Sequence, residues 1–264
     1  FAITTTANYS ILDRTLPHLL PSRCSMCRGA LETVNQCICD ACVSELPWLE
    51  DCCQQCAVPL TTDALCPDCQ SKAPAYRRCI SAFIYQAPID NIILRLKKDP
   101  YVAEIKQLTA LLAERILRCY QSTEQKQEQK PSLPELVIPM PLHWRKIAQR
   151  GFNQSQIIGN LLSNYFLYEH KTPLRVLSDI CQRTSNNKAQ QTLNKKQRAK
   201  SVKDAFSIGA RSDFSLKGKT VAILDDVVTT GATANALAST VINAGADQVD
   251  IWSLARTSWN NSSQ

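Results

Sequence analysis

The chain separates into a long part, in which predicted strands and helices alternate, and a shorter part, in which apolar residues show neither helical nor strand periodicity. Short apolar runs rich in β-branched residues predict strands. These lie at residues 81–85, 136–140, 174–177, 205–208, 220–224 and 248–254. Apolar residues at helical spacing predict helices between them, at residues 89–96, after Pro100, at 153–168 and at 232–244. Strands that alternate with helices form right-handed βαβ units, so the expected fold class is α/β, with a parallel sheet flanked by helices.

The remaining segments suggest the domain boundaries. Residues 1–20 predict a short helix with leucines on one face, and a cysteine-rich stretch follows it. We therefore expect a small N-terminal domain at residues 1–78 and an α/β domain at residues 79–264. Two polar segments, residues 121–134 and 182–203, interrupt the second domain. Both are expected to be loops, and the longer one is long enough to act as a mobile lid.

Cysteines give the small domain its chemistry. The chain has 13 of them, and most fall into C-x-x-C pairs at similar intervals. The pairs are Cys24 and Cys27, Cys39 and Cys42, Cys53 and Cys56, and Cys66 and Cys69. Two such pairs complete a closed tetrahedral site of thiolates, so the four predict two structural zinc ions with no open position for catalysis. Sequential and interleaved pairing both remain open. A redox motif needs only one pair, and disulfides would suit a secreted chain, for which no leader is visible.

The most specific chemical signal lies where the strand at residues 220–224 ends. Asp225 and Asp226 follow it at the carboxyl edge of the expected sheet, where α/β folds bind ligands. A hydroxyl-rich turn into a helix comes next, formed by Val227, Val228, Thr229, Thr230, Gly231, Ala232 and Thr233. Amides at a helix start hold phosphate, and a carboxylate pair accepts hydrogen bonds from a ribose diol, directly or through Mg²⁺. The segment predicts a sugar-phosphate site rather than an ordinary turn with an aspartate cap.

Positive charge gathers between residues 141 and 203, which hold twelve basic and two acidic side chains in a chain of net charge +7. Arg145 and Lys146 follow the strand at 136–140 and are expected to bind a second anion at the same edge, while Arg150 either joins them or fixes the turn. The flexible loop adds Lys188, Lys195, Lys196 and Arg198. Such a surface suits a phosphorylated sugar and single-stranded nucleic acid equally well.

Several motifs occur together along most of the chain. Besides the cysteine pairs they are Leu-Pro-Trp-Leu at 46–49, Pro-Met-Pro-Leu-His at 139–143, Arg-Gly-Phe-Asn-Gln at 150–154, Gln190 with Leu193 and Arg198, and the aspartate and threonine segment at 225–233. This set resembles the ComF/GntX family of double-zinc-ribbon, type I phosphoribosyltransferase-like proteins. The resemblance implies that fold, binding of 5-phosphoribosyl 1-pyrophosphate (PRPP) with Mg²⁺, and a role in DNA uptake during competence or in the use of external DNA.

The resemblance leaves two hypotheses for the function. As a phosphoribosyltransferase, which is the favoured one, the protein would transfer phosphoribose from PRPP to an unidentified acceptor. Asp225 and Asp226 would be its catalytic residues, and the zinc module or the helices of residues 89–118 would cover the acceptor. As a non-catalytic adaptor, it would keep the pocket as a ligand site and bind single-stranded DNA or a helicase or translocation protein. No apolar run is long enough to span a membrane, so we expect no membrane insertion and a cytoplasmic location.

Overall fold

The computed structural model describes residues 22–31, 33, 36–61, 64–124, 133–183, 205–209 and 215–258. The chain forms two compact units, Phe1–Leu46 and Pro47–Gln264, so the second cysteine group shares a unit with the sheet. The domain boundary expected after residue 78 stays a prediction. The helix predicted at residues 1–20 and the loop residues Lys188, Lys195, Lys196 and Arg198 lie outside the described residues.

The smaller unit is organised around its cysteines. A bridge between Arg23 and Ala30 and a hydrogen bond from the Cys24 amide to the Gly29 carbonyl, at 2.8 Å, fold the first C-x-x-C pair into a tight loop. Helix α2 (Asp40–Ser44) begins directly after Cys39, its N-cap residue, and contains Cys42, the other member of the second pair.

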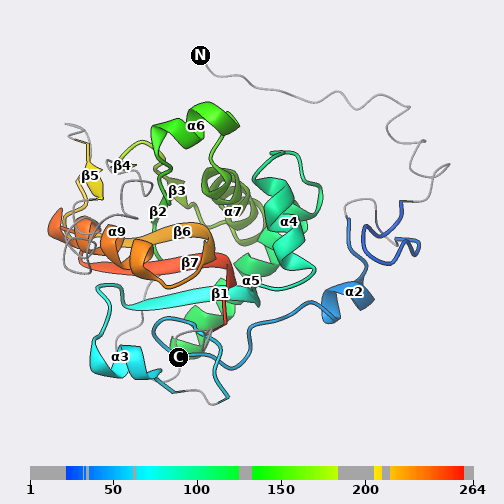
Figure 1. Ribbon diagram of the computed structural model, residues 1–264, viewed down its shortest axis with the longest axis horizontal. Helices are drawn as coiled ribbons and strands as arrows, with labels where there is room; N and C mark the ends of the chain where they lie inside the picture. Colours follow the sequence, from blue (N-terminus) through cyan, green and yellow to red (C-terminus); the bar gives the residue numbers. More distant parts are fainter. Residues whose placement is uncertain are drawn as a thin grey trace, which may run out of the picture. The chain divides into compact units, whose positions relative to one another are not determined.

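A five-stranded parallel sheet forms the centre of the larger unit (Figure 1). Its strands lie in the order β1 (Arg78–Ile84), β7 (Gln248–Arg256), β6 (Thr220–Val228), β2 (Leu136–Pro139) and β3 (Arg175–Val176). All of β2 and all of β7 after its first residue are buried, which explains why their sequences are nearly continuous apolar runs. The predicted α/β fold with a parallel sheet is confirmed.

The strand predicted at residues 205–208 lies outside this sheet. It is β5 (Phe206–Ile208), and it pairs antiparallel with β4 (Cys181–Arg183), a short strand that the apolar pattern does not reveal. The two strands flank one excursion of the chain, so they pair without the crossover helix that a parallel neighbour needs.

Helices α5 (Glu104–Glu124), α7 (Gln154–His170) and α9 (Ala232–Asn243) pack on the sheet. The larger unit also contains α3 (Pro67–Ser71), α4 (Ile89–Leu96) and α6 (Trp144–Arg150). Gly159 of α7, which also packs on α5, lies against Leu224 of β6, whereas Leu237 of α9 shares an apolar cluster with Ile223. Adjacent strand residues point to opposite faces, so α7 and α9 lie on opposite sides of β6.

The segment that precedes the second cysteine group covers the outer edge of β1. Leu49 donates its amide to the Ala82 carbonyl at 3.0 Å, and Ile84 donates to the Pro47 carbonyl at 2.7 Å. The ring of Trp48 packs on Phe83 with 4.8 Å between centroids. This pairing protects an edge strand that would otherwise expose its backbone, and it fixes the second zinc ribbon to the sheet.

Candidate functional site

After the neighbouring strands β2 and β6, the chain turns toward opposite sides of the sheet. The chain passes from β2 to β3 on one side of the pair, and from β6 to β7 on the other. Open parallel sheets bind ligands at such a switch point. Pro139 and Leu224 lie opposite each other in the ladder, so the segments that follow them meet at this edge.

Asp225 and Asp226 lie within β6, which continues beyond its predicted end at residue 224. The extension arises because Asp225 pairs with Ser253 and Val227 pairs with Ala255 on β7. The neighbouring strand therefore sets the length of β6, and the aspartates are held by a ladder on one side rather than by a loop.

Each aspartate has a fixed partner. Asp225 Oδ1 accepts a hydrogen bond from Ser155 Oγ at 3.2 Å and from the Asp226 amide at 2.9 Å. Asp226 is 5% exposed, and its Oδ2 forms an ion pair with Lys97 Nζ at 3.0 Å. Burial, followed by the negative charge of Asp226, raises the pKa of Asp225 well above its usual range. The pair is thus poised to gain from a hydrogen-bond donor or a cation.

A tight corner between α6 and α7 shapes the basic side of the site. Gly151 ends α6 with φ 80°, a left-handed conformation that suits glycine. Asn153 then caps α7, since its Oδ1 accepts from the Ser155 amide at 3.0 Å and its Nδ2 donates to the carbonyl that follows β2. Arg150 Nη1 donates to Gln154 Oε1 at 3.3 Å. The motif Arg-Gly-Phe-Asn-Gln therefore fixes both Arg150 and the serine that contacts Asp225.

Four basic side chains line a cavity of about 190 Å³ together with the two carboxylates; they are Lys97, Lys146, Arg150 and Arg183. Partial loss of solvent, followed by the nearby charges of Arg150 and Arg183, lowers the pKa of Lys146. Because cations outnumber carboxylates in this cavity, it suits a polyanion.

The turn between β6 and α9 closes another side of this cavity. Thr229, Gly231 and Thr233 line it. Gly231 has φ 74°, and no side chain caps the helix that starts after it. The Ala232 amide donates to Thr230 Oγ1 at 3.4 Å, and the amides that follow it in the first helical turn, with the helix dipole behind them, favour a phosphate group.

The structure brings most of the predicted sugar-phosphate residues together. One cavity is lined by Asp225, Asp226, Val227, Val228, Thr229, Gly231, Thr233 and Lys146. Thr230 and Ala232 line a neighbouring cavity of about 600 Å³, which Thr229 and Gly231 also line. Arg145 lines neither cavity; its guanidinium lies over the ring of Trp144, 5.3 Å from the centroid. The ligands assigned to these residues stay predictions.

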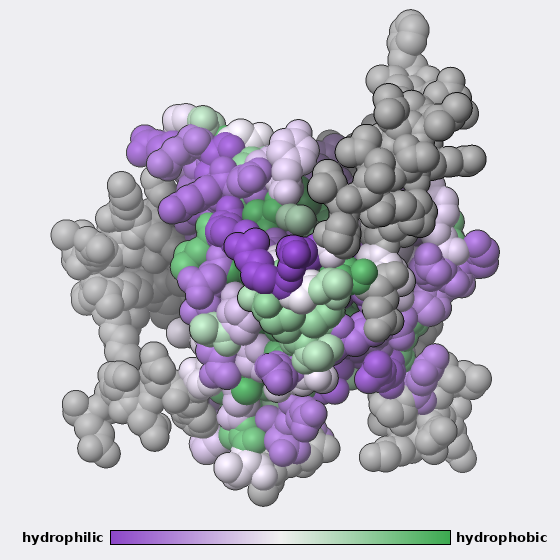
Figure 2. Space-filling model, turned by 90° about the vertical axis from the view of Figure 1, so that its right-hand side faces the viewer, coloured by the Kyte–Doolittle hydropathy of each residue, from purple (hydrophilic) through white to green (hydrophobic). Residues whose placement is uncertain are grey.

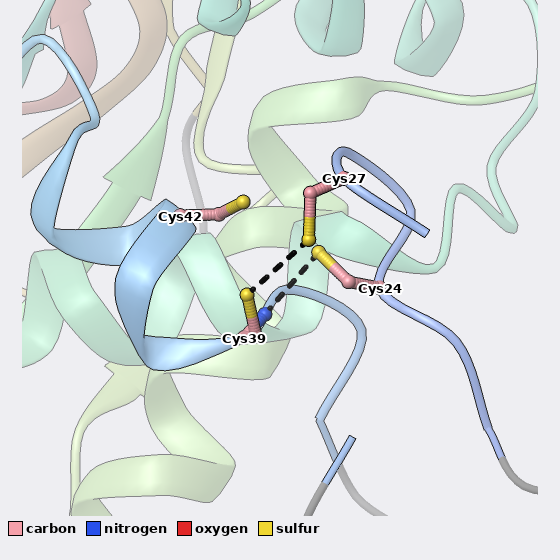
Figure 3. A group of neighbouring side chains, drawn as sticks. All are labelled: Cys24, Cys27, Cys39 and Cys42. Carbon is pink, nitrogen blue, oxygen red and sulfur yellow. Dashed lines mark hydrogen bonds between the residues drawn. The ribbon is translucent and has the colours of Figure 1, made fainter. Parts of the chain in front are cut away.

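Figure 3 shows the tetra-cysteine group of the smaller unit, in which the Sγ atoms of Cys24, Cys27, Cys39 and Cys42 all lie within 4.8 Å of one another. The Sγ atoms of Cys27 and Cys39 are 3.6 Å apart, close to the roughly 3.8 Å between thiolates on one tetrahedral zinc. Although burial opposes it, hydrogen bonds from backbone amides, including that of Cys39, lower the pKa of Cys24 to about 6. The group fits a structural zinc ion.

The larger unit holds the second tetra-cysteine group, formed by Cys53, Cys56, Cys66 and Cys69. All four are buried, the Sγ atoms of Cys56 and Cys66 are 3.6 Å apart, and the Cys66 amide donates to Cys53 Sγ at 3.3 Å. Pairing is therefore sequential and not interleaved. Both donor sets are consistent with the two predicted structural zinc ions.

Comparison with known proteins adds the family. A double zinc ribbon domain matches residues 15–70. The DNA utilization protein YhgH of Escherichia coli O6:H1 is 30% identical over 239 residues, which cover 90% of this chain and 98% of that protein. Competence protein F of Haemophilus influenzae is 27% identical over 239 residues, which cover 89% of this chain and 96% of that protein. The chain belongs to the ComF family. Among solved structures, a hypoxanthine phosphoribosyltransferase from Staphylococcus aureus is 14% identical, covers 60% of this chain and 68% of its own, and has a TM-score of 0.34.

In this ComF-family chain, the matched zinc-ribbon segment contributes one tetra-cysteine group to each compact unit. Among the described residues, no helix has the length and apolarity needed to cross a membrane. Figure 2 shows one face of the molecule, on which hydrophilic residues lie beside smaller hydrophobic areas.

The ComF-family site also contains side chains that the sequence patterns did not assign to it. Lys97 follows α4 and reaches the aspartates only through tertiary packing, so no local pattern marks it. Arg183 ends β4 and belongs to the basic segment of residues 182–203, whose cations were expected near the leaving pyrophosphate. Ser155 and Gln154 belong to the corner after α6, where the motif around Arg150 was the available signal.

Proposed function

We propose that this protein binds PRPP with Mg²⁺ in the cavity beside Asp225 and Asp226, and that it transfers the phosphoribosyl group to a nitrogen acceptor in the service of DNA uptake or the use of external DNA. One observation carries the proposal: a carboxylate pair, four cations and the start of helix α9 line one cavity at a switch point of the sheet. The names of the relatives, a DNA utilization protein and a competence protein, support the connection with DNA.

The two phosphate-bearing ends of PRPP find separate partners. The 5-phosphate would lie on the turn of residues 229–233, where amides and threonine hydroxyls are donors and Gly231 allows close approach. The pyrophosphate would lie against Lys146, Arg150 and Arg183, which supply charge-assisted hydrogen bonds and neutralise the leaving group.

The ribose would lie between these ends, over the carboxylates. Its two hydroxyls are donors, and Asp225 and Asp226 are acceptors. The same carboxylates would hold Mg²⁺, which supplies further neutralisation of the pyrophosphate when bound. Lys97 is then a positioning residue, since its ion pair fixes the carboxylate of Asp226.

The reaction follows from these placements. The lone pair of the acceptor nitrogen attacks C1 of the ribose from the face opposite the pyrophosphate. The C–N bond forms as the C1–O bond breaks, the pyrophosphate leaves with the electron pair, and the proton on nitrogen passes to solvent. Positive charge develops on the ribose ring in a loose transition state, and the two nearby carboxylates stabilise it.

Calorimetry with PRPP and Mg²⁺ tests the pocket. Asp225→Asn and Asp226→Asn each remove a charged acceptor worth about 1.5–3 kcal/mol, so we expect PRPP to bind about 10- to 100-fold more weakly. Asp247→Asn, at an exposed position outside the cavity, is the matched control and should bind like the wild type. Equal affinity in all four proteins would remove the PRPP assignment. A screen for pyrophosphate release then tests turnover.

A second candidate function, binding of single-stranded DNA without catalysis, is favoured by one surface feature. Trp144 is 64% exposed on α6, and the guanidinium of Arg145 lies over its ring. Basic grooves with exposed aromatic rings bind single strands by stacking, at about 1–3 kcal/mol per base. Trp144→Ala should therefore weaken binding of an oligothymidine at least about fivefold in a gel shift. Tyr168→Ala, which removes another exposed ring, is the control. Equal loss in both variants would refute a specific platform at Trp144.

A further inference from the structure

The larger of the two cavities, of about 600 Å³, lies between the second tetra-cysteine group and the turn after β6. Its walls come from the zinc ribbon, residues 72–76, the start of α9 and the end of β7. Its volume falls within the roughly 300–1,000 Å³ of small-molecule sites. Thr229 and Gly231 also line the proposed PRPP cavity, so both cavities reach the same turn.

The charge around this cavity argues against a second phosphate site. Arg256 and Lys72 are its cations, and Asp68 is its carboxylate. Three of the cysteines of the second tetra-cysteine group also line it, and a zinc ion with four thiolates carries a formal charge of about −2. The negative charges therefore offset the two cations. A neutral polar ligand fits this lining better than a polyanion does.

The polar groups in the walls favour a ligand with several acceptors. Asn235 Oδ1 accepts from the Ala75 amide at 2.7 Å, which leaves its Nδ2 as a donor. Arg256 is only 4% exposed; it donates Nε and Nη1 to backbone and hydroxyl oxygens, and among the described residues nothing accepts from its Nη2. Because Arg256 lines the cavity, this nitrogen can donate to a ligand oxygen or ring nitrogen there.

Apolar surfaces complete the walls. The ring of Tyr76 is buried, and its hydroxyl lies 3.3 Å from where a Cβ on Gly231 would stand. Val58, Ala73 and Pro74 add aliphatic surface. A flat ring with acceptors along its edge satisfies both the apolar walls and the free donors.

We infer that this cavity is the acceptor subsite of the protein and that the acceptor is a planar nitrogen heterocycle of the nucleobase class. The inference rests on the proposed function. Asn235 and Arg256 would donate to the edge of the heterocycle, and Tyr76 would contact its face. The second zinc ribbon, rather than the helices of residues 89–118, then forms the wall that selects the acceptor. Nucleobases are products of DNA breakdown, which agrees with relatives named for DNA utilization.

The test is ligand-observed NMR with adenine, guanine, cytosine, thymine and uracil, at concentrations up to about the millimolar level at which weak sites fill. Ala73→Trp fills the cavity from an exposed position outside the PRPP pocket, and Ala244→Trp places the same ring at the far end of α9. Asn235→Asp keeps the oxygen that accepts from Ala75 and replaces the free donor with an acceptor. PRPP binding and zinc content are measured on every variant.

We expect at least one base to bind the wild type, with affinity at least about tenfold lower in Ala73→Trp and unchanged in Ala244→Trp. Asn235→Asp should weaken binding at least about fivefold while zinc and PRPP binding are kept. The inference fails if no base binds, or if Ala73→Trp binds bases like the wild type. Base binding at the cavity without any PRPP binding would overturn the proposed function and leave the cavity as a nucleobase site. PRPP binding without base binding would overturn the cavity alone.

Discussion

Arg256 links the second zinc ribbon to the turn that forms the candidate site, and its removal should be costly. Its Nε donates to the Cys56 carbonyl at 2.9 Å, and its Nη1 donates to the Val228 carbonyl at 3.1 Å and to that of Thr229. One buried guanidinium therefore ties a zinc-ligand residue, the end of β6 and the start of the turn to β7. We expect Arg256→Met to destabilise the larger unit and to loosen the turn.

The magnitude follows from the bonds that are lost. A hydrogen bond to a charged group contributes about 1.5–3 kcal/mol, and a buried carbonyl left unpaired costs about 1–3 kcal/mol. Methionine fills part of the volume but gives the Cys56 carbonyl no donor, whereas the Val228 carbonyl keeps the amide of Thr257 at 3.1 Å. We therefore expect the free energy of unfolding to fall by about 3–5 kcal/mol, a large share of the roughly 5–15 kcal/mol typical of a domain. Arg256→Lys keeps one donor group and should lose about half as much.

Urea denaturation measures this effect. Trp252 lies fully buried on the same strand as Arg256, so its fluorescence reports unfolding of the larger unit, with circular dichroism as a second probe. Arg118→Met, on an exposed part of α5, is the matched control and should stay within about 0.5 kcal/mol of the wild type. A loss below about 1 kcal/mol in Arg256→Met would refute the argument that this side chain holds the ribbon and the turn together.

Three further outcomes follow from the site. Gly231→Ala forces alanine into a φ of 74° and brings its Cβ against the Tyr76 hydroxyl, so the free energy of unfolding should fall by about 1–2 kcal/mol and PRPP binding should weaken in calorimetry. Gly218→Ala is the control: its φ is 70°, but its Cβ would meet no neighbouring atom, so it should lower stability without changing PRPP binding. Lys97→Met leaves Asp226 without its ion-pair partner and should weaken PRPP binding several-fold, while Lys98→Met should not; equal effects would contradict the role of Lys97. Cys66→Ser should lower zinc from two ions per chain to one by metal analysis; a content still at two would exclude Cys66 as a ligand.

Most of the fold follows from the apolar pattern because the central strands are buried on both faces. Such strands read as continuous apolar runs bounded by turns, and the helices between them show a clear period. The pattern fails where pairing, rather than burial, decides the structure. Strand β4 is only three residues long, and β6 extends through two aspartates because β7 lies beside it. Neither feature has a local signal in the sequence.

The candidate site divides in the same way. Asp225, Asp226 and the turn after them are contiguous, so one motif marks them. Lys97 and Arg183 come from segments far away in the chain, and their position depends on how α4 and β4 pack. The anion-binding roles expected of Arg145 and Lys146 stay predictions, and the structure separates the two side chains, because α6 is a helix and successive residues on a helix point in different directions. Lys146 lines the cavity, and Arg145 lies over Trp144.

The two tetra-cysteine groups have the same motif but different surroundings. Of the four cysteines of the first group only Cys24 is buried, and Cys27 is exposed, whereas all four cysteines of the second group are buried in the cluster that includes α9. The second zinc site therefore supports the apolar core, the Arg256 contacts and the wall of the larger cavity. Loss of zinc there should disturb ligand binding, while loss of the first zinc should leave PRPP binding in the larger unit unchanged. Calorimetry on Cys27→Ser and Cys66→Ser distinguishes the two, and equal PRPP affinity in both variants would show that the second ribbon does not shape the site.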